Sequence, residues 1–177
     1  KRFFEGYGDI RLPHKFKIAV GGCPNNCVKP DLNDVGIVGQ RIPNFHAEEC
    51  KGCKKCRIEE ICPMGAPQRK DGKIDIDAET CTHCGRCAGK CYFKALPDGT
   101  SGFKVYVCGR WGKKVAQGRP LSKIFATEQE VLAVVEKAIL LFREQGYAGE
   151  RFSQTIDRIG FEKAEEMLLS DDILGRK

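Results

Sequence analysis

Cysteines recur at three-residue intervals in two runs near the middle of the chain, and this ladder restricts the fold more than any other feature. The first run is Cys50-x2-Cys53-x2-Cys56 with Cys62-Pro63 after it, and the second is Cys81-x2-Cys84-x2-Cys87-x3-Cys91. A short loop with three such thiolates can grip three corners of a [4Fe–4S] cubane. Because a tight loop cannot wrap all four corners, the fourth ligand has to come from another part of the chain.

The two runs resemble those of the bacterial two-cluster ferredoxin, in which the fourth cysteine of each run ligates the other cluster. The resemblance assigns one [4Fe–4S] cluster to Cys50, Cys53, Cys56 and Cys91, and the other to Cys81, Cys84, Cys87 and Cys62. In the first run the five residues RIEEI precede the fourth cysteine where the pattern has three, so we expect a longer turn there. Two clusters held close together would form a short wire for electrons.

Zinc is the main alternative for these cysteines. Zinc sites favour two C-x2-C pairs separated by about a dozen residues or more, so a triple ladder repeated twice would leave surplus ligands. A [3Fe–4S] form is a further alternative. The chain has 11 cysteines, an odd number, and their clustering is not that of a disulfide framework. We therefore expect metal-bound thiolates in a reducing, cytoplasmic protein.

The sequence on both sides of the ladder predicts strands followed by helices. Residues 15–20 (KFKIAV), 34–39 (DVGIVG) and 102–109 (GFKVYVCG) resemble strands bounded by Gly, Pro and Asn. Thr127 and Glu130 form a capping-box signature, and apolar residues then recur at helical spacing as far as Gly146.

Two short helices are expected next, at about 150–159 and 161–169, divided at Gly160. We therefore predict an α+β domain over residues 1–43 and 99–177, interrupted by a ferredoxin-like insert over 44–98.

Three stretches outside the ladder resemble the sirohaem-dependent nitrite and sulfite reductase family. They are LPHKFKIAVGGCPNNC (12–27), FKVYVCGRWGKK (103–114) and GERFSQTIDRIGFEKAEEML (149–168). The insert between them is similar to that of the dissimilatory and anaerobic branches of this family. The resemblance implies a sulfite-reductase-like sheet-and-helix fold, a sirohaem and a third [4Fe–4S] cluster coupled to it.

The resemblance also implies roles for residues near the first of these stretches. Cys23 and Cys27 match the family's C-x3-C motif, with Cys27 as the ligand that bridges the cluster to the haem iron. Lys15 and Lys17 match its basic pair, which meets the substrate oxyanion or the haem carboxylates. The partner motif C-x5-C is absent from the 22 residues before Cys23, so we expect a C-terminal piece of a longer subunit, inactive alone. In such a piece Cys23 and Cys27 would be free or weakly occupied.

The second stretch raises further candidates. Arg110 and Lys113 are candidates to meet haem carboxylates, although a solvated basic turn is an equal alternative. Cys108 stands where the family usually has glycine, and we interpret it as a small buried thiol in preference to a substitute ligand. Trp111 is interpreted as a packing residue.

The bulk properties exclude some functions and leave two. The formal charge of +6 is spread along the chain without a basic helix, so no nucleic-acid partner is expected. The longest apolar run, near 131–142, is too short to span a membrane. The leading hypothesis is part of a sulfite or nitrite reductase that receives electrons from a donor subunit or a ferredoxin. The alternative is a non-catalytic, ferredoxin-type electron-transfer module.

Overall fold

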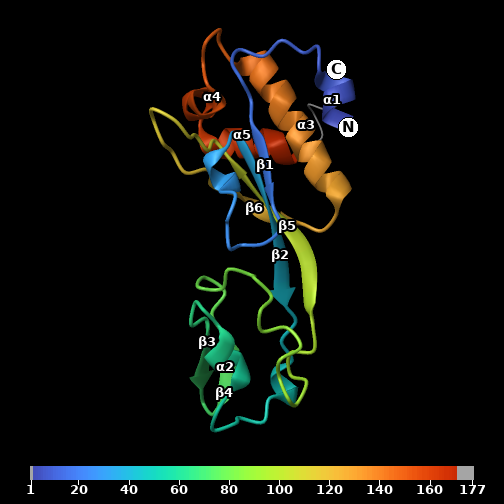
Figure 1. Cartoon of the computed structure of the whole chain (residues 1–177), viewed down its shortest axis with the longest axis vertical. Coiled ribbons are helices and arrows are strands. Elements are labelled where there is room, and N and C mark those ends of the chain that lie inside the picture. The colour runs from blue at the N-terminus through green and yellow to red at the C-terminus, as the bar shows by residue number, and fades with distance from the viewer. Residues whose placement is uncertain (1, 171–177) are drawn as a thin grey trace.

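A mixed four-stranded sheet forms the upper part of the molecule. The computed structural model describes residues 2–170 and places the strands in the order β1-β2-β5-β6 (Figure 1). Their bounds are β1 Ile18–Gly21, β2 Val35–Pro43, β5 Gly99–Val107 and β6 Arg119–Phe125. The first pair is parallel and the other two are antiparallel. Together with the helices described below, this sheet confirms the predicted α+β class.

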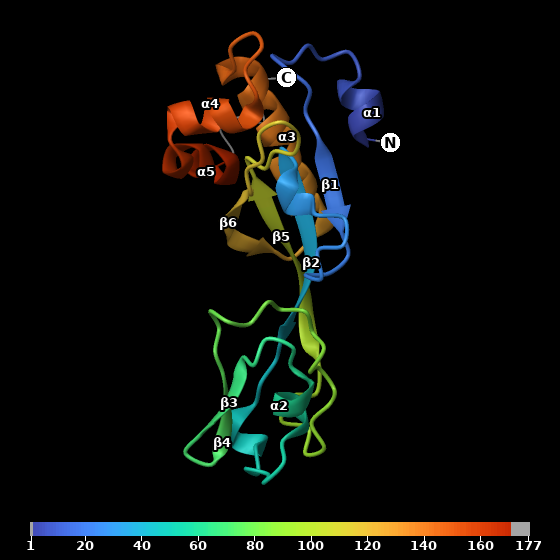
Figure 2. The same cartoon turned by 60° about the vertical axis from the view of Figure 1, so that its left-hand side comes forward.

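Helices cover one face of this sheet. The longest is α3 (Glu128–Gln145), with α4 (Phe152–Ile159) and α5 (Phe161–Leu169) beside it and the short α1 (Arg2–Tyr7) near β1 (Figure 2). The predicted apolar stripe of α3 is buried against the sheet. Phe142 and Phe152 contact one another edge to face at 5.5 Å between ring centroids and are fully buried. None of the helices among residues 2–170 is long and apolar enough to cross a bilayer.

The strands β2 and β5 extend beyond the rest of the sheet as a two-stranded ribbon. They pair without a break from Val35 with Val107 to Pro43 with Gly99. In contrast, β1 reaches only as far as Val38, and β6 pairs with β5 no further than Phe103. The outer half of the ribbon therefore projects alone, and it carries residues 44–98 at its end (Figure 1).

Residues 44–98 contain little regular structure. They form the hairpin β3 (Pro67–Lys70) and β4 (Lys73–Ile76), the helix α2 (Arg57–Ile61) and a 3-10 turn at Ala47–Glu49. A few fully buried apolar side chains hold this part together, among them Ile58, Ala66 and Leu96. The helix α2 is formed by the five residues RIEEI that precede Cys62, so the expected longer turn is a short helix.

Several boundaries differ from those predicted. The strand expected at 15–20 begins only at Ile18, whereas the one expected at 34–39 continues to Pro43. The edge strand β6 and the helix α1 were not predicted at all. Pro120 and the charged side chains of β6 obscure its pattern, and an edge strand tolerates such residues because one side of its backbone needs no partner. The capping box, α3 and the pair α4–α5 divided at Gly160 are confirmed.

A buried ion pair joins the start of β2 to the start of α4. The Arg151 Nη2 donates to both carboxylate oxygens of Asp34 at 3.0 Å, and the two side chains are 8% and 1% exposed. Asp34 also accepts the backbone N–H of Lys17 on its side chain and that of Cys108 on its carbonyl oxygen. One residue thus fixes the chain before β1, the start of β2 and the end of β5.

We expect Arg151→Met to lower the free energy of unfolding by about 3–5 kcal/mol, because it leaves the Asp34 carboxylate buried without its counter-charge. Urea unfolding followed by circular dichroism measures this. The matched control is Lys70→Met, which breaks the exposed Lys70–Asp75 pair and should change stability little. Equal effects of the two substitutions would contradict the role given to the buried pair.

A second expectation concerns pH and the start of α3. Hydrogen bonds, first of all from the Lys123 ammonium, lower the pKa of the exposed Glu130 carboxyl from 4.5 to about 2. A lowered pKa stabilises the folded state above about pH 4.5, and this contribution disappears as the pH falls towards 2. Glu130→Gln should therefore be less stable than the wild type near neutral pH, and the difference should shrink below pH 4.5 in urea titrations. Glu128→Gln, outside the capping box, should show no such pH-dependent difference.

Candidate metal centres

The outer cysteine cavity lies in the part of the molecule formed by residues 44–98. Four half-buried cysteines line it, namely Cys50, Cys53, Cys56 and Cys91. Apolar side chains complete its wall, including Phe45, Ile58 and Ile74. Three of the cysteines come from the first run and the fourth from the end of the second run.

The inner cysteine cavity has the complementary composition. It is lined by Cys62, Cys81, Cys84 and Cys87, again half-buried, with Pro43 at the end of β2 among its neighbours. Each run therefore sends its last cysteine to the other run's cavity. The structure brings together the two sets of four that the ferredoxin resemblance assigned, and their role as cluster ligands stays a prediction.

Left-handed backbone conformations shape the loops between the cysteines. Gly52 has φ +64°, and a Cβ at this position would lie 2.2 Å from the carbonyl oxygen of Gly72. In the second run His83 and Gly85 have φ +54° and +69°. Such residues curl the chain tightly enough for successive thiols to face one centre.

The donor set suits iron–sulfur clusters. Burial raises the pKa of the Cys81 and Cys87 thiols, so iron has to displace their protons when it binds. Among the described residues, no group of three or more His, Cys, Asp or Glu side chains could hold a single metal ion. A cubane takes one thiolate at each of its four irons, whereas a structural zinc takes all four thiolates on one ion.

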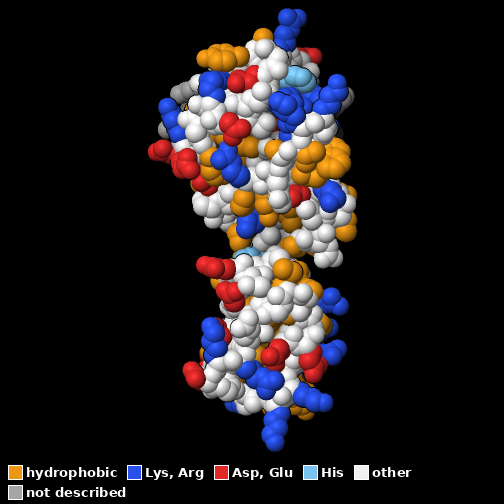
Figure 3. Space-filling view, turned by 90° about the vertical axis from the view of Figure 1, so that its left-hand side faces the viewer, with side chains coloured by type: hydrophobic (Ala, Val, Ile, Leu, Met, Phe, Trp, Pro, Cys, Tyr) orange, Lys and Arg blue, Asp and Glu red, His pale blue; other side chains and the backbone are white. Residues whose placement is uncertain are grey.

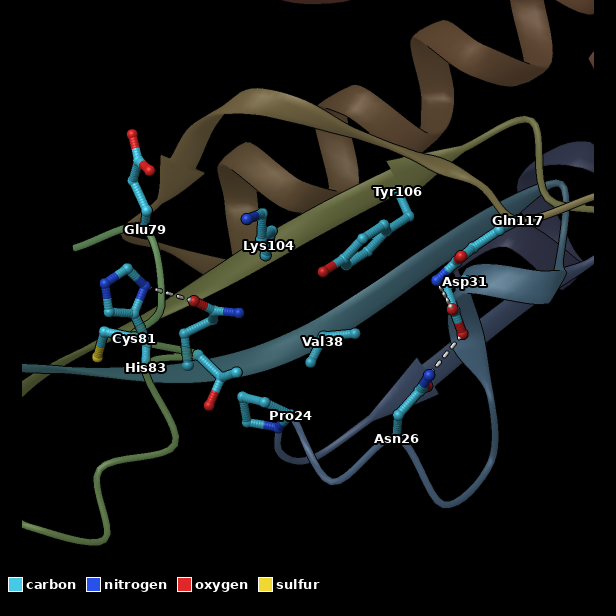
Figure 4. Close-up of a pocket in the computed structure, with 12 residues that line it drawn as sticks. Pro24, Asn26, Asp31, Val38, Glu79, Cys81, His83, Lys104, Tyr106 and Gln117 are labelled. Atoms are coloured by element: carbon cyan, nitrogen blue, oxygen red, sulfur yellow. Dashed lines mark hydrogen bonds between the residues drawn. The ribbon is translucent and has the colours of Figure 1, made fainter. Parts of the chain in front are cut away.

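A polar cleft of about 250 Å³ lies beside the inner cysteine cavity (Figure 4). One wall comes from alternate residues of the ribbon, which share a face of the sheet: Val38 and Gln40 on β2, and Lys104 and Tyr106 on β5. The other walls come from two cysteine loops: Pro24 and Asn26, which lie between Cys23 and Cys27, and Cys81 and His83.

Hydrogen bonds fix the second cysteine run to the ribbon at this cleft. The Arg41 N–H donates to the His83 carbonyl oxygen at 2.7 Å, and Arg41 pairs with Cys84 in a single bridge. The His83 Nδ1 lies 3.0 Å from the Gln40 Oε1. Burial, and then the Lys104 ammonium, lower the pKa of His83, so its neutral form is favoured. His83 thus supports the loop through its backbone carbonyl and its side chain.

Two of the residues predicted to serve a third centre, Lys17 and Cys27, lie in one hollow near the start of β1. Lys17, Cys27 and Trp111 line a shallow hollow of about 290 Å³ together with Val28, Lys29, Leu32 and Asn33. Cys23 and Cys27 are both exposed, and Cys23 is not part of the hollow's lining.

The other candidates of this region are only partly gathered. Lys15, Arg110 and Lys113 do not line the hollow, although Arg110 and Lys113 flank Trp111 in a turn closed by the backbone pairing of Arg110 with Ala116. The Trp111 side chain is 61% exposed, so its interpretation as a packing residue is wrong.

The interpretation of Cys108 as a small buried thiol is confirmed. Its side chain is part of the hydrophobic core, and its backbone adopts φ +72°, a conformation that favours the glycine usual here in the family. Burial raises the pKa of the Cys108 thiol to about 12, which keeps it protonated and therefore a poor metal ligand at neutral pH.

Comparison with known proteins decides the family. The family model of the nitrite and sulphite reductase 4Fe-4S domain matches residues 1–173. The chain belongs to this family. The resemblance drawn from the three sequence stretches is thereby confirmed.

Relatives support the same assignment. The chain is 33% identical over 168 residues to the coenzyme F420-dependent sulfite reductase of Methanocaldococcus jannaschii, a match that covers 90% of this chain and 25% of that protein. It is 26% identical to the dissimilatory-type sulfite reductase subunit beta of Archaeoglobus fulgidus, over 93% of this chain and 48% of that subunit. The chain thus spans a quarter to about half of these two relatives.

A solved structure shows the same fold. The crystal structure of dissimilatory sulfite reductase I superposes with a TM-score of 0.64 and 25% sequence identity, covering 97% of this chain and 47% of that one. This member of the nitrite and sulphite reductase family therefore has a sulfite-reductase-like α+β fold and is an iron–sulfur domain related to sulfite reductases.

Iron counting tests the two cysteine cavities. Protein prepared without oxygen should contain about eight irons per chain, and Cys56→Ser or Cys84→Ser should each lose about four, because each removes a ligand of a different cluster. Cys108→Ser, which removes a buried thiol outside both cavities, should keep its full iron content. Zinc in place of iron, or loss of all iron from either single variant, would contradict two independent clusters.

Proposed function

We propose that this chain is the electron-entry part of a sirohaem-dependent sulfite reductase. Residues 44–98 hold two [4Fe–4S] clusters as a ferredoxin-like insert and pass electrons towards the Cys23–Cys27 loop. The polar cleft supports this route, because Cys81 of the inner cysteine cavity and Pro24 of the Cys23–Cys27 loop both line it. Electron transfer requires the two centres to lie close together. It does not require any bond of the protein between them to form or break.

The order of the centres along this route follows from their positions. The inner cysteine cavity borders the end of β2 and the polar cleft, whereas the outer cysteine cavity shares neither. Electrons therefore enter at the outer cavity, cross to the inner cavity and leave beside His83. The hydrogen bond from the Arg41 N–H to the His83 carbonyl oxygen anchors the second cysteine run to β2 at this exit.

The shallow hollow has the chemistry that a sirohaem requires. Val28 and Trp111 offer exposed apolar surface for a flat ring, and Lys17 and Lys29 offer positive charge for its carboxylates or for an anionic substrate. Cys27 lies in the same hollow and would supply a thiolate ligand to the bound group. When bound, a sirohaem supplies the iron at which sulfite is reduced. The family's C-x5-C pair does not occur in the 22 residues before Cys23.

Among the basic candidates, Lys17 is favoured over Lys15 for contact with substrate. Its backbone N–H is held by Asp34, which fixes the base of the side chain, and it lines the hollow that contains Cys27. Its ammonium group can hold an anion and deliver a proton to oxygen as a sulfur–oxygen bond breaks. Sulfite is proposed ahead of nitrite because the relatives named above are sulfite reductases. A donor subunit or ferredoxin and a cytoplasmic location remain part of this proposal.

A non-catalytic electron-transfer module is the second candidate. One relative motivates it, an uncharacterized ferredoxin of Methanocaldococcus jannaschii that is 25% identical, although the sulfite reductases named above favour the first function. The match covers 85% of this chain and 84% of that ferredoxin. In that case the shallow hollow would hold no haem and the chain would only relay electrons.

Two substitutions in the complete protein distinguish these functions. Cys27→Ser should weaken the coupling of haem to its cluster and abolish sulfite reduction, while the irons of residues 44–98 remain. Cys84→Ser should keep the haem absorption bands and slow reduction by an external donor. Absorption spectra, iron content and sulfide production measure these outcomes. Protein that lacks haem bands and forms no sulfide, yet holds both clusters, would favour the relay module.

A further inference from the structure

The outer cysteine cavity lies at the end of the molecule farthest from the sheet. The ribbon enters residues 44–98 at Pro43, which lines the inner cysteine cavity. Both cavities contact the β3–β4 hairpin: the inner one at its open end, through Pro67 and Ile76, and the outer one nearer its turn, through Arg69 and Lys73, in the lower part of Figure 1. A redox partner that approaches this end meets the outer cluster first.

Lysines without ion-pair partners lie next to the cysteines of this cavity in the sequence. Lys51 lies between its first two cysteines, Lys54 and Lys55 lie between the next two, and Lys90 and Lys94 flank Cys91. All five are exposed, and none forms an ion pair with another residue in the described part of the chain. Figure 3 shows basic side chains projecting from the lower end of the molecule.

Several acidic groups of the same region are already neutralised. Glu59 pairs with Arg69, Asp75 with Lys70, and Glu60 with Arg57. Glu49 and Asp71 are also exposed beside this cavity and form no ion pair with another described residue, so the five lysines outnumber these two free carboxylates but are not the only charges there.

An exposed aromatic pair lies among these lysines. Tyr92 and Phe93 follow Cys91 directly, are 90% and 41% exposed, and contact edge to face with ring centroids 5.2 Å apart. Phe93 also lines the outer cysteine cavity. Removing such an exposed ring from water is favourable when a partner covers it. Aromatic side chains are enriched among the residues that contribute most to protein–protein binding, with charged residues at the rim.

We propose that this lysine–aromatic surface, made of Lys51, Lys54, Lys55, Lys90, Lys94, Tyr92 and Phe93, docks an acidic one-electron carrier protein. The proposal rests on the function proposed above, in which the outer cluster accepts electrons. The lysines attract the carrier, and the aromatic pair provides apolar contact directly beside Cys91. One electron then leaves the reduced carrier, which is oxidised, and reduces the outer cluster; no bond forms or breaks.

The test uses the full chain with its clusters, purified without oxygen, and a small acidic [4Fe–4S] ferredoxin as the probe. Calorimetry at several salt concentrations should show binding that weakens with salt. Lys54→Glu/Lys94→Glu should lower the affinity by about tenfold or more and reduce the salt dependence, and Tyr92→Ala should lower it by about tenfold. Lys54→Gln/Lys94→Gln should lie between the wild type and the charge reversal.

The matched control is Arg11→Glu/Lys163→Glu, which reverses two exposed charges in the part that carries the sheet and should leave the affinity unchanged. Equal weakening by both charge reversals, or no weakening by Lys54→Glu/Lys94→Glu, would overturn the proposal. Binding of duplex DNA as tight as that of the ferredoxin would overturn it as well, because the surface would then be a general polyanion site.

Two further readouts separate this proposal from the function on which it rests. Iron content and the cluster midpoint potentials of Lys54→Glu/Lys94→Glu should match those of the wild type. A variant that shifts the potentials but binds the ferredoxin normally would show that the lysines only balance cluster charge. If the complete wild-type protein contained no haem, the reductase function would be refuted, while the measured binding of the ferredoxin would stay valid.

Discussion

The unbroken pairing of β2 with β5 is the constraint on which the rest of the structure depends. Nine residues of each strand are in register, from Val35 with Val107 to Pro43 with Gly99. One end lies in the core, where the Asp34–Arg151 pair and the helices hold it, and the other end carries the cysteine cavities. A slip by one residue would turn Gln40 and Lys104 away from the polar cleft, because side chains alternate between the faces of a strand. The register of β2 and β5 therefore fixes how the inner cysteine cavity lies relative to the Cys23–Cys27 loop.

The cysteine cavities could be predicted because their geometry is local. Three thiols on one short loop must face one centre, and the resemblance to a two-cluster ferredoxin supplied the fourth. The polar cleft could not be predicted in the same way. Gln40 and Tyr106 meet through strand pairing, and Pro24 joins them only because the Cys23–Cys27 loop folds back over β2. No spacing in the sequence encodes such contacts between distant segments. The alternation of side chains along a strand accounts only for Lys104 and Tyr106 lying on the same face of β5.

The same distinction explains what the sequence missed around the shallow hollow. Lys15 and Lys17 alternate in sequence and were expected to share an anionic pocket, yet β1 begins only at Ile18 and Lys17 alone lines the shallow hollow. Trp111 was interpreted as a packing residue, and tryptophan is indeed well buried on average. Its position in the turn after β5 exposes it beside Cys27 instead. An exposed tryptophan next to an exposed cysteine and two lysines is more informative about a ligand than a buried one would have been.

The outer cavity, the inner cavity and the Cys23–Cys27 pair differ in how far this chain encloses them. This difference is consistent with electron flow from the outer cavity towards Cys23 and Cys27. The outer and inner cavities are each enclosed by four half-buried cysteines and apolar walls, whereas Cys23 and Cys27 are exposed. Unpaired lysines concentrate around the outer cavity, and the inner cavity borders a cleft with both acidic and basic side chains, including Asp31 and Lys104. The acidic carrier proposed above would therefore dock at the end remote from the shallow hollow. Because the ribbon separates these two ends, such a carrier and the small anionic substrate proposed for the hollow would not compete for the same surface.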